Sequence, residues 1–307
     1  MNRIRLGYAC VNLSLGENGR TSRTCRLSNA SPNRLETLAR ENLSGLVNVL
    51  NWNVAQSIRL YRISSGVIPL ASHPQAQWPW RKTLKRELVR IGRLVRDSGL
   101  RVSMHPGQYT VLNSPHRQVA ESARAELQYH ANFLDQSGLD GTHKIILHVG
   151  GLYGDRNASL DRFQKRFDTL PLSVRSRLVL ENDERSYKTG DVLALSESLG
   201  IPMVFDYLHH IGGGNELPTK RLLTRIYDTW SRSDGRPELH YSTQRTGSRM
   251  GSHANMINAR GFVRFTQLLP AADIDIMLEA KSKDLALLNL RHKLLTRSRN
   301  LRKWVIA

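Results

Sequence analysis

The feature that most constrains the fold is an alternation of short apolar runs with longer stretches of helical periodicity, repeated eight times along the chain. The apolar runs are rich in Val, Ile and Leu, and they lead in turn to Tyr8, Ser64, His105, His148, Glu181, Asp206, His240 and Glu279. Continuous apolar strands separated by helices are typical of a parallel sheet with both faces covered. In a chain of 307 residues the pattern predicts an α/β fold, a (β/α)₈ TIM barrel forming a single domain over residues 1–307.

The helices are predicted from apolar residues spaced three and four apart. They are expected at about 33–53, 80–97, 115–136, 160–170, 191–199, 219–230, 255–268 and 283–301, the last being basic. Ser114 is the expected N-cap of the third helix. The second strand fits the pattern least well, because Arg59, Arg62 and Ser64 interrupt it. A doubly wound open sheet is the alternative fold, but LGYACVNLSLG after the first strand is not its glycine-rich phosphate loop.

The chain is strongly basic, with 45 Lys and Arg against 26 Asp and Glu, a formal net charge of +19 at pH 7. Such an excess attracts polyanions, so the first expected partner is nucleic acid and the second an anionic membrane surface. A generically basic soluble protein is the remaining alternative. The basic residues are spread along the whole chain instead of forming a detachable tail, which fits a single domain.

Cysteine content and hydropathy predict the compartment. Cys10 and Cys25 cannot build a disulfide framework, and no Cys-x-x-Cys pair indicates a zinc ribbon. No apolar run approaches the roughly 20 residues that span a bilayer, and the first residues lack the pattern of a secretory signal. We therefore expect a cytoplasmic protein that does not associate with membranes.

Six successive apolar runs end on, or within a residue or two of, a group that binds metal or transfers a proton. These groups are His105, His148, Glu181, Asp206 with His209, His240 and Glu279. The C-terminal ends of barrel strands meet at one rim, so these side chains are expected to converge. A lone histidine is usually structural, but burying six such groups together is costly without a cation. Nitrogen and oxygen ligands without thiolate suit Zn²⁺, Mn²⁺ or Fe²⁺.

Glu181 lies on the fifth of the eight strands and is the expected bridge between two cations. Two cations about 3.5–4 Å apart activate a water and clamp the attacked and leaving oxygens of a phosphoryl group. Together with the positive charge, this predicts metal-assisted hydrolysis of a phosphodiester in DNA or RNA.

Six segments resemble the ultraviolet damage endonucleases, metal-dependent repair enzymes on a TIM barrel related to endonuclease IV. They are LGYACVNL, SMHPGQYTVLNSP, ILHVGG, LVLENDE, VFDYLHH and LHYSTQ, in the family's order. The resemblance implies cleavage immediately 5′ to cyclobutane pyrimidine dimers and (6-4) photoproducts in double-stranded DNA, with abasic sites also accepted. It implies two or three divalent cations, Mn²⁺ first, with Zn²⁺ or Co²⁺ as alternatives.

The resemblance also assigns ligands to each cation. His105, His148 and Glu181 match the first; Glu181, Asp206, His240 and Glu279 match the second; His209 and His253 match the third. Glu181 and Glu238 are the expected catalytic residues. Glu238 stands where the family commonly has a carboxylated lysine, and its carboxylate would supply similar oxygens directly.

Further matches concern the DNA. The positions expected to contact the lesion or its surroundings are Tyr8, Asn12, His73, Gln108 and Tyr109. For His73 a contact to metal and a contact to phosphate are both open. Pro106 and Gly107 favour a tight turn that projects Gln108 and Tyr109 from the rim, where they would fill the gap left by flipped bases. The alternative is that Tyr109 packs under its own loop.

Phosphate contacts are expected from basic residues of the rim loops. The candidates by position are Arg156, Lys188, Arg245 and Arg249, each of which could equally be a solvated charge. A monomer is expected, because a duplex must lie across the rim unobstructed.

Two other functions fit parts of the pattern. A metal-dependent sugar isomerase or epimerase shares this barrel class, but a neutral substrate gains nothing from a net charge of +19. The other is a non-catalytic nucleic-acid-binding protein. The complete set of metal ligands at the strand ends argues against it, because binding alone does not require them.

Overall fold

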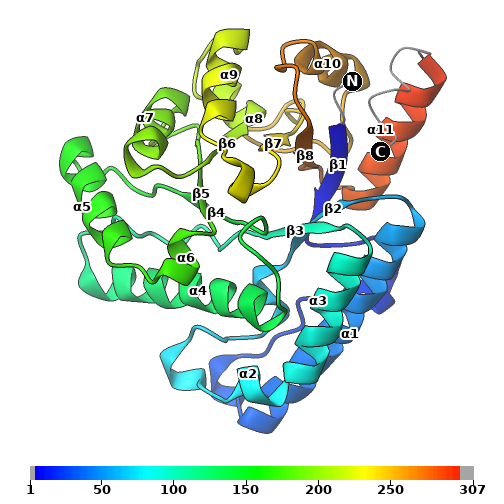
Figure 1. Ribbon diagram of the computed structural model, residues 1–307, viewed down its shortest axis with the longest axis vertical. Coiled ribbons are helices and arrows are strands. Elements are labelled where there is room, and N and C mark those ends of the chain that lie inside the picture. The colour runs from blue at the N-terminus through cyan, green and yellow to red at the C-terminus, as the bar shows by residue number, and fades with distance from the viewer. Residues whose placement is uncertain (1–3, 298–307) are drawn as a thin grey trace.

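Eight parallel strands close into one barrel, in which β1 pairs with both β2 and β8 (Figure 1). The computed structural model describes residues 4–297. The strands are β1 (Ile4–Ala9), β2 (Leu60–Ile63), β3 (Arg101–Met104), β4 (Ile145–His148), β5 (Leu178–Glu181), β6 (Met203–Asp206), β7 (Glu238–Tyr241) and β8 (Ile274–Leu278). Every predicted strand is present, including the second, and the predicted barrel is confirmed.

Alternation along each strand decides which side chains reach the barrel axis. In β5, Leu178 and Leu180 belong to the large core cluster packed between strands and helices. Val179 instead joins a separate small cluster with Ile146 and Val204 of the neighbouring strands. Glu181 follows Val179 on this inner face. The same alternation turns His148 of β4, Asp206 of β6 and His240 of β7 toward Glu181 at the C-terminal rim.

The helices surround the strands in the expected order (Figure 1). They are α1 (Pro32–Ala55), α2 (Trp80–Thr83), α3 (Lys85–Asp97), α4 (Arg117–Gln136), α5 (Arg156–Asp168), α6 (Leu172–Arg175), α7 (Thr189–Leu199), α8 (Tyr207–Gly212), α9 (Lys220–Asp228), α10 (Ala259–Thr266) and α11 (Lys283–Arg297). Within residues 4–297, none is long and apolar enough to cross a membrane.

Several helix boundaries differ from the predictions; for example, α5 begins at Arg156 instead of about residue 160, and α10 begins at Ala259 instead of about residue 255. The stretch expected as one helix over 80–97 breaks at Leu84 into α2 and α3. Helix α4 begins at Arg117 after His116, and the Ser114 hydroxyl accepts the His116 amide at 3.2 Å instead of capping the helix. The end of the helix expected over 283–301 lies partly outside the described residues, which end at 297.

Helix α8 is too short to show a periodic apolar pattern. It begins directly after β6, where the Asp206 carboxylate accepts the amide of His209 at 2.6 Å. A side-chain cap of this kind satisfies one of the free amides at a helix start. Because the cap is also a rim residue, it fixes His209 beside the strand ends.

Candidate metal centre

The carboxylate of Glu181, at the end of β5, lies among imidazoles from three other strands. Its Oε2 is 2.9 Å from Nε2 of His105 and 3.5 Å from Nε2 of His148. Its Oε1 is 2.6 Å from Nδ1 of His240. Glu181 and His240 are buried, whereas His105 and His148 are partly exposed. The strand ends therefore converge on one buried carboxylate, as the alternation of apolar runs predicted.

Two groups of potential ligands share Glu181. One consists of His105, His148 and Glu181, and the other of Glu181, Asp206 and His209. Within each group the ligand atoms lie within 4.8 Å of one another. Side chains from different strands and from α8 thus meet closely enough to surround two neighbouring cations.

The donor atoms of these groups suit divalent cations. All are imidazole nitrogens or carboxylate oxygens, a set compatible with Zn²⁺, Mn²⁺ and similar ions. Asp206 Oδ2 and His148 Nδ1 are buried without a hydrogen-bond partner among residues 4–297. Buried polar atoms without partners are destabilising. A cation beside Asp206 would give its free oxygen a partner, so the residues present fit a metal centre.

The electrostatics keep the central carboxylate in the form that binds a cation. Burial disfavours the charged form of Glu181, but the His240 and His148 imidazoles outweigh it and hold the pKa well below its usual value. Burial similarly opposes charge on His209, but Asp206 and Glu184 raise the pKa of this imidazole to about 10. Because a ligating histidine must lose a proton, cation binding here is expected to release protons.

Glu184 is a partner of His209 that the sequence analysis did not single out. Its Oε2 is 2.8 Å from Nδ1 of His209, and this contact lowers the Glu184 pKa to about 2. A carboxylate on one ring nitrogen orients the imidazole and fixes its tautomer. Glu184 lies in the segment LENDE that carries part of the family resemblance, which was the available signal.

Glu279, directly after β8, is paired with Arg62 of β2. The guanidinium donates to Glu279 Oε1, and its Nη2 donates to Nε2 of His240 at 2.7 Å. The second oxygen of Glu279 is 3.7 Å from Nε2 of His253. His253 therefore faces Glu279, while His209, which the resemblance places with it, groups with Glu181 and Asp206.

Glu238 lies inside the barrel, one inward position below His240 on β7. It is fully buried, its Oε1 accepts the Ser103 hydroxyl at 3.2 Å, and the same oxygen is 3.7 Å from Nε2 of His240. This position places Glu238 beside His240, and a catalytic role for Glu238 stays a prediction.

A cavity of about 720 Å³ opens beside the metal centre. Its lining includes His105, His148 and His209, together with Gln108 and Arg249 of the rim loops. Tyr109, next to Gln108, is 83% exposed, so it does not pack under its own loop. The cavity therefore joins the expected ligands to the expected lesion contacts.

Tyr8 and Asn12, the expected lesion contacts of the first strand, lie in the protein interior. Both are buried, and the Tyr8 hydroxyl donates to Asn53 of α1 at 2.7 Å while it accepts the amide of Asn12 at 2.8 Å. Tyr8 lies on the outward face of β1 with Ile4 and Leu6. Residues on that face point to the helices, and contact of Tyr8 and Asn12 with a lesion stays a prediction.

His73 has a local structural role in the connection after β2. Its Nδ1 accepts the Gln75 amide at 3.2 Å at the start of a short 3₁₀ turn. It belongs to neither ligand group formed by residues 4–297. A phosphate contact through the other ring nitrogen stays a prediction.

The basic rim candidates Arg156, Lys188, Arg245 and Arg249 are all exposed. Arg156 forms an ion pair with Asp191 at 2.5 Å, which partly neutralises its charge. Arg249 lines the cavity described above. Phosphate contact stays a prediction for all four.

The model of the UV-endonuclease UvdE family matches residues 4–305. The chain belongs to the UV-endonuclease family. The UV DNA damage endonuclease of Clostridium perfringens (strain 13 / Type A) is 39% identical over 285 residues, which is 92% of this chain and 69% of the relative. The crystal structure of SacUVDE has a TM-score of 0.89 at 39% identity and covers 96% of this chain and 99% of that one.

Endonuclease IV from Thermus thermophilus shares the fold at a TM-score of 0.56 and 17% identity, over 95% of this chain and 99% of that one. Membership of the UV-endonuclease family makes the protein a DNA repair nuclease that acts on ultraviolet damage. The alternative of a sugar isomerase or epimerase is not favoured.

Proposed function

We propose that this UV endonuclease hydrolyses the phosphodiester immediately 5′ to cyclobutane pyrimidine dimers and (6-4) photoproducts in double-stranded DNA, and also acts at abasic sites. Two or three divalent cations are the proposed cofactors, with Mn²⁺ first and Zn²⁺ or Co²⁺ as alternatives. The observation that carries the proposal is the Glu181 carboxylate, which belongs to both ligand groups. A shared carboxylate is how two-metal phosphodiesterases hold their cations.

When bound, the cations supply an activated water and polarise the phosphoryl group. His105 and His148 would hold one cation with Glu181. Asp206 and His209 would hold the other, and the remaining ligands at this end are His240, His253 and Glu279. Glu184 orients His209 through Nδ1, and Glu238 supports His240 from inside the barrel. These two ligands are thus held before DNA arrives, which is the preorganisation that catalysis requires.

Damage recognition is assigned to Gln108 and Tyr109. The exposed phenol of Tyr109 extends from the loop that follows His105, at the edge of the cavity. An aromatic ring and a carboxamide can replace the stacking lost when damaged bases leave the duplex, and weak pairing at a lesion lowers the energy needed to flip it. The proposed binding mode has one duplex across the rim of a monomer.

The function is tested by incubating ultraviolet-irradiated and untreated supercoiled plasmid with the protein and Mn²⁺, with and without EDTA. We expect nicking of the irradiated plasmid only, and none when EDTA chelates the cation. The Glu181→Gln protein, purified in parallel, controls for contaminating nucleases. Equal nicking of both plasmids, or nicking that survives EDTA, would contradict the proposal.

If Tyr109 fills the gap left by flipped bases, Tyr109→Ala should mainly reduce the preference for damaged over undamaged DNA. Stacking of an aromatic side chain on a base contributes about 1–3 kcal/mol, so the ratio of cleavage rates on damaged and undamaged duplexes should fall about tenfold. Tyr109→Phe keeps the ring and should retain the ratio. Competition between the two duplexes in one reaction measures it. A Tyr109→Ala protein with an unchanged ratio would show that Tyr109 does not fill the gap left by flipped bases.

A further inference from the structure

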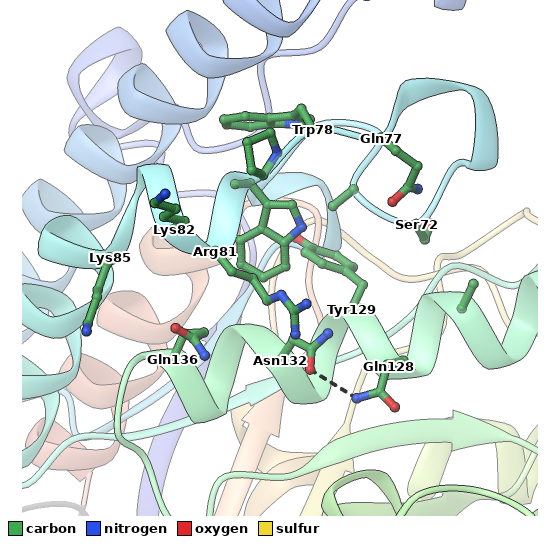
Figure 2. A pocket seen from close by; sticks show the side chains of 14 residues that line it. Ser72, Gln77, Trp78, Arg81, Lys82, Lys85, Gln128, Tyr129, Asn132 and Gln136 are labelled. Atoms are coloured by element: carbon green, nitrogen blue, oxygen red, sulfur yellow. Dashed lines mark hydrogen bonds between the residues drawn. The ribbon is translucent and has the colours of Figure 1, made fainter.

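A second cavity, of about 640 Å³, lies outside the barrel (Figure 2). Its walls come from residues between Ala71 and Lys85, which include α2 and the start of α3, and from the second half of α4. We call it the α2–α4 pocket. None of the catalytic, metal-binding or lesion-binding residues considered above lines it, so it requires a separate explanation.

The pocket is positively charged. Arg81, Lys82 and Lys85 line it and are exposed, and their side chains bond to no other residue within 4–297. Two acidic residues of the same helices are paired with other arginines: Glu87 with Arg40, and Asp135 with Arg177. Free cations that share a concave wall raise the local concentration of anions.

One carboxylate stands at the edge of the pocket. Glu126 of α4 accepts the hydroxyl of Ser72, a lining residue, and its second oxygen is 3.8 Å from Nδ1 of buried His130. Both oxygens of the Glu126 carboxylate therefore face partners beside the pocket. No Asp or Glu is among the residues that line the cavity itself.

The remaining wall offers neutral donors and aromatic rings. Trp78 is 8% exposed, and its indole Nε1–H finds no acceptor within residues 4–297. The Trp80 ring meets Tyr129 edge-on, with ring centroids 5.8 Å apart. Gln128 donates to Asn132 at 3.0 Å along the opposite wall (Figure 2). A buried donor without an acceptor is destabilising.

Hydrogen bonds connect the pocket to the rim. Tyr129, in the pocket wall, donates its hydroxyl to the Ser65 carbonyl at 2.8 Å. The Ser65 hydroxyl donates in turn to the backbone carbonyl of His105, one of the expected ligands. Tyr129 therefore links the pocket wall to the end of β3 through Ser65.

We propose that the α2–α4 pocket binds a backbone phosphate of the duplex that flanks the damage, as a second DNA contact separate from the metal centre. The proposal rests on the proposed function, because a long DNA substrate is what brings a phosphodiester to this side of the rim. Ammonium and guanidinium groups bind phosphate without regard to sequence. A free nucleotide carries the same phosphate chemistry and is distinguished by the test.

The test combines a charge reversal in the pocket with neutral phosphates in the DNA. The pocket variant is Lys82→Glu with Lys85→Glu. The control variant, Lys220→Glu with Arg221→Glu, removes the same formal charge from exposed positions of α9. Fluorescence anisotropy in EDTA measures the affinity of each protein for a 30-bp duplex with one photoproduct, in which single phosphates are replaced in turn by methylphosphonates.

At one flanking position, methylphosphonate should weaken binding about three- to tenfold for the wild type and the control, but leave the pocket variant unchanged. On unmodified DNA the slope of log affinity against log salt should fall by about 0.9 per lost contact. The proposal is overturned if the pocket variant responds at every position as the control does. A free nucleotide would be the ligand instead if deoxyadenosine monophosphate quenches the tryptophan fluorescence of the wild type but not of the pocket variant, and no methylphosphonate position distinguishes the two proteins. That result also overturns the proposal. Plasmid nicking by the wild type tests the proposed function independently.

Discussion

Glu181→Gln should abolish cleavage while DNA binding stays nearly intact. The substitution keeps the shape of the side chain but removes the charge that both ligand groups share. The amide also brings N–H groups to a position where two carboxylate oxygens now face His105 and His240. Loss of a partner outside the ligand sphere typically lowers metal affinity or activity about 10–100-fold, and loss of the shared ligand should exceed that.

Three measurements separate the parts of this prediction. Nicking of irradiated plasmid reports cleavage, calorimetric titration with Mn²⁺ reports the number of bound cations, and anisotropy in EDTA reports DNA affinity. Glu197→Gln is the matched control, because Glu197 is an exposed carboxylate paired only with Arg225 of α9 within residues 4–297. Retained cleavage with an unchanged number of cations would show that Glu181 does not bridge two sites.

The alternation of side chains between the inner and outer faces of the barrel explains why the convergence of the strand ends could be predicted. His148, Glu181 and Asp206 each occupy the last position of a strand, on the inward face. Their convergence could be predicted because a closed parallel barrel brings all strand ends to one rim. For Tyr8, the family resemblance did not indicate which face of β1 the side chain occupies. Ile4, Leu6 and Tyr8 alternate with Arg5 and Gly7, so parity in β1 already directed the tyrosine outward.

Arg62 was visible in the sequence as a polar interruption of the second strand, but its role there could not be predicted. Its polarity interrupts the apolar pattern of β2, but Tyr61 and Ile63 on either side pack in the outer core. Alternation therefore places Arg62 inward, among the ligands. Its partner Glu279 is 217 residues away, and that pairing depends on β1 pairing with both β2 and β8. Local loop details, such as the start of α4, depend on competing hydrogen bonds that no periodicity records.

Arg62→Met should lower the free energy of unfolding by about 3 kcal/mol when divalent cations are chelated. The guanidinium is buried and bonds to both Glu279 and His240. Without it, the Glu279 carboxylate would remain in a low-dielectric site near the ionised Glu181, where an unpaired buried charge is strongly destabilising. Urea unfolding in EDTA, followed by circular dichroism, measures the loss.

The same comparison in saturating Mn²⁺ distinguishes charge from packing. A cation held by these carboxylates would itself offset their charge, and ligand binding to the native state alone stabilises it. The difference between Arg62→Met and wild type should therefore shrink when Mn²⁺ is present. Arg225→Met, which breaks an exposed ion pair with Glu197, should cost less than about 1 kcal/mol in either condition. An equal loss for Arg62→Met with and without Mn²⁺ would mean that Arg62 stabilises the barrel by packing, and that Glu279 does not need a positive charge beside it.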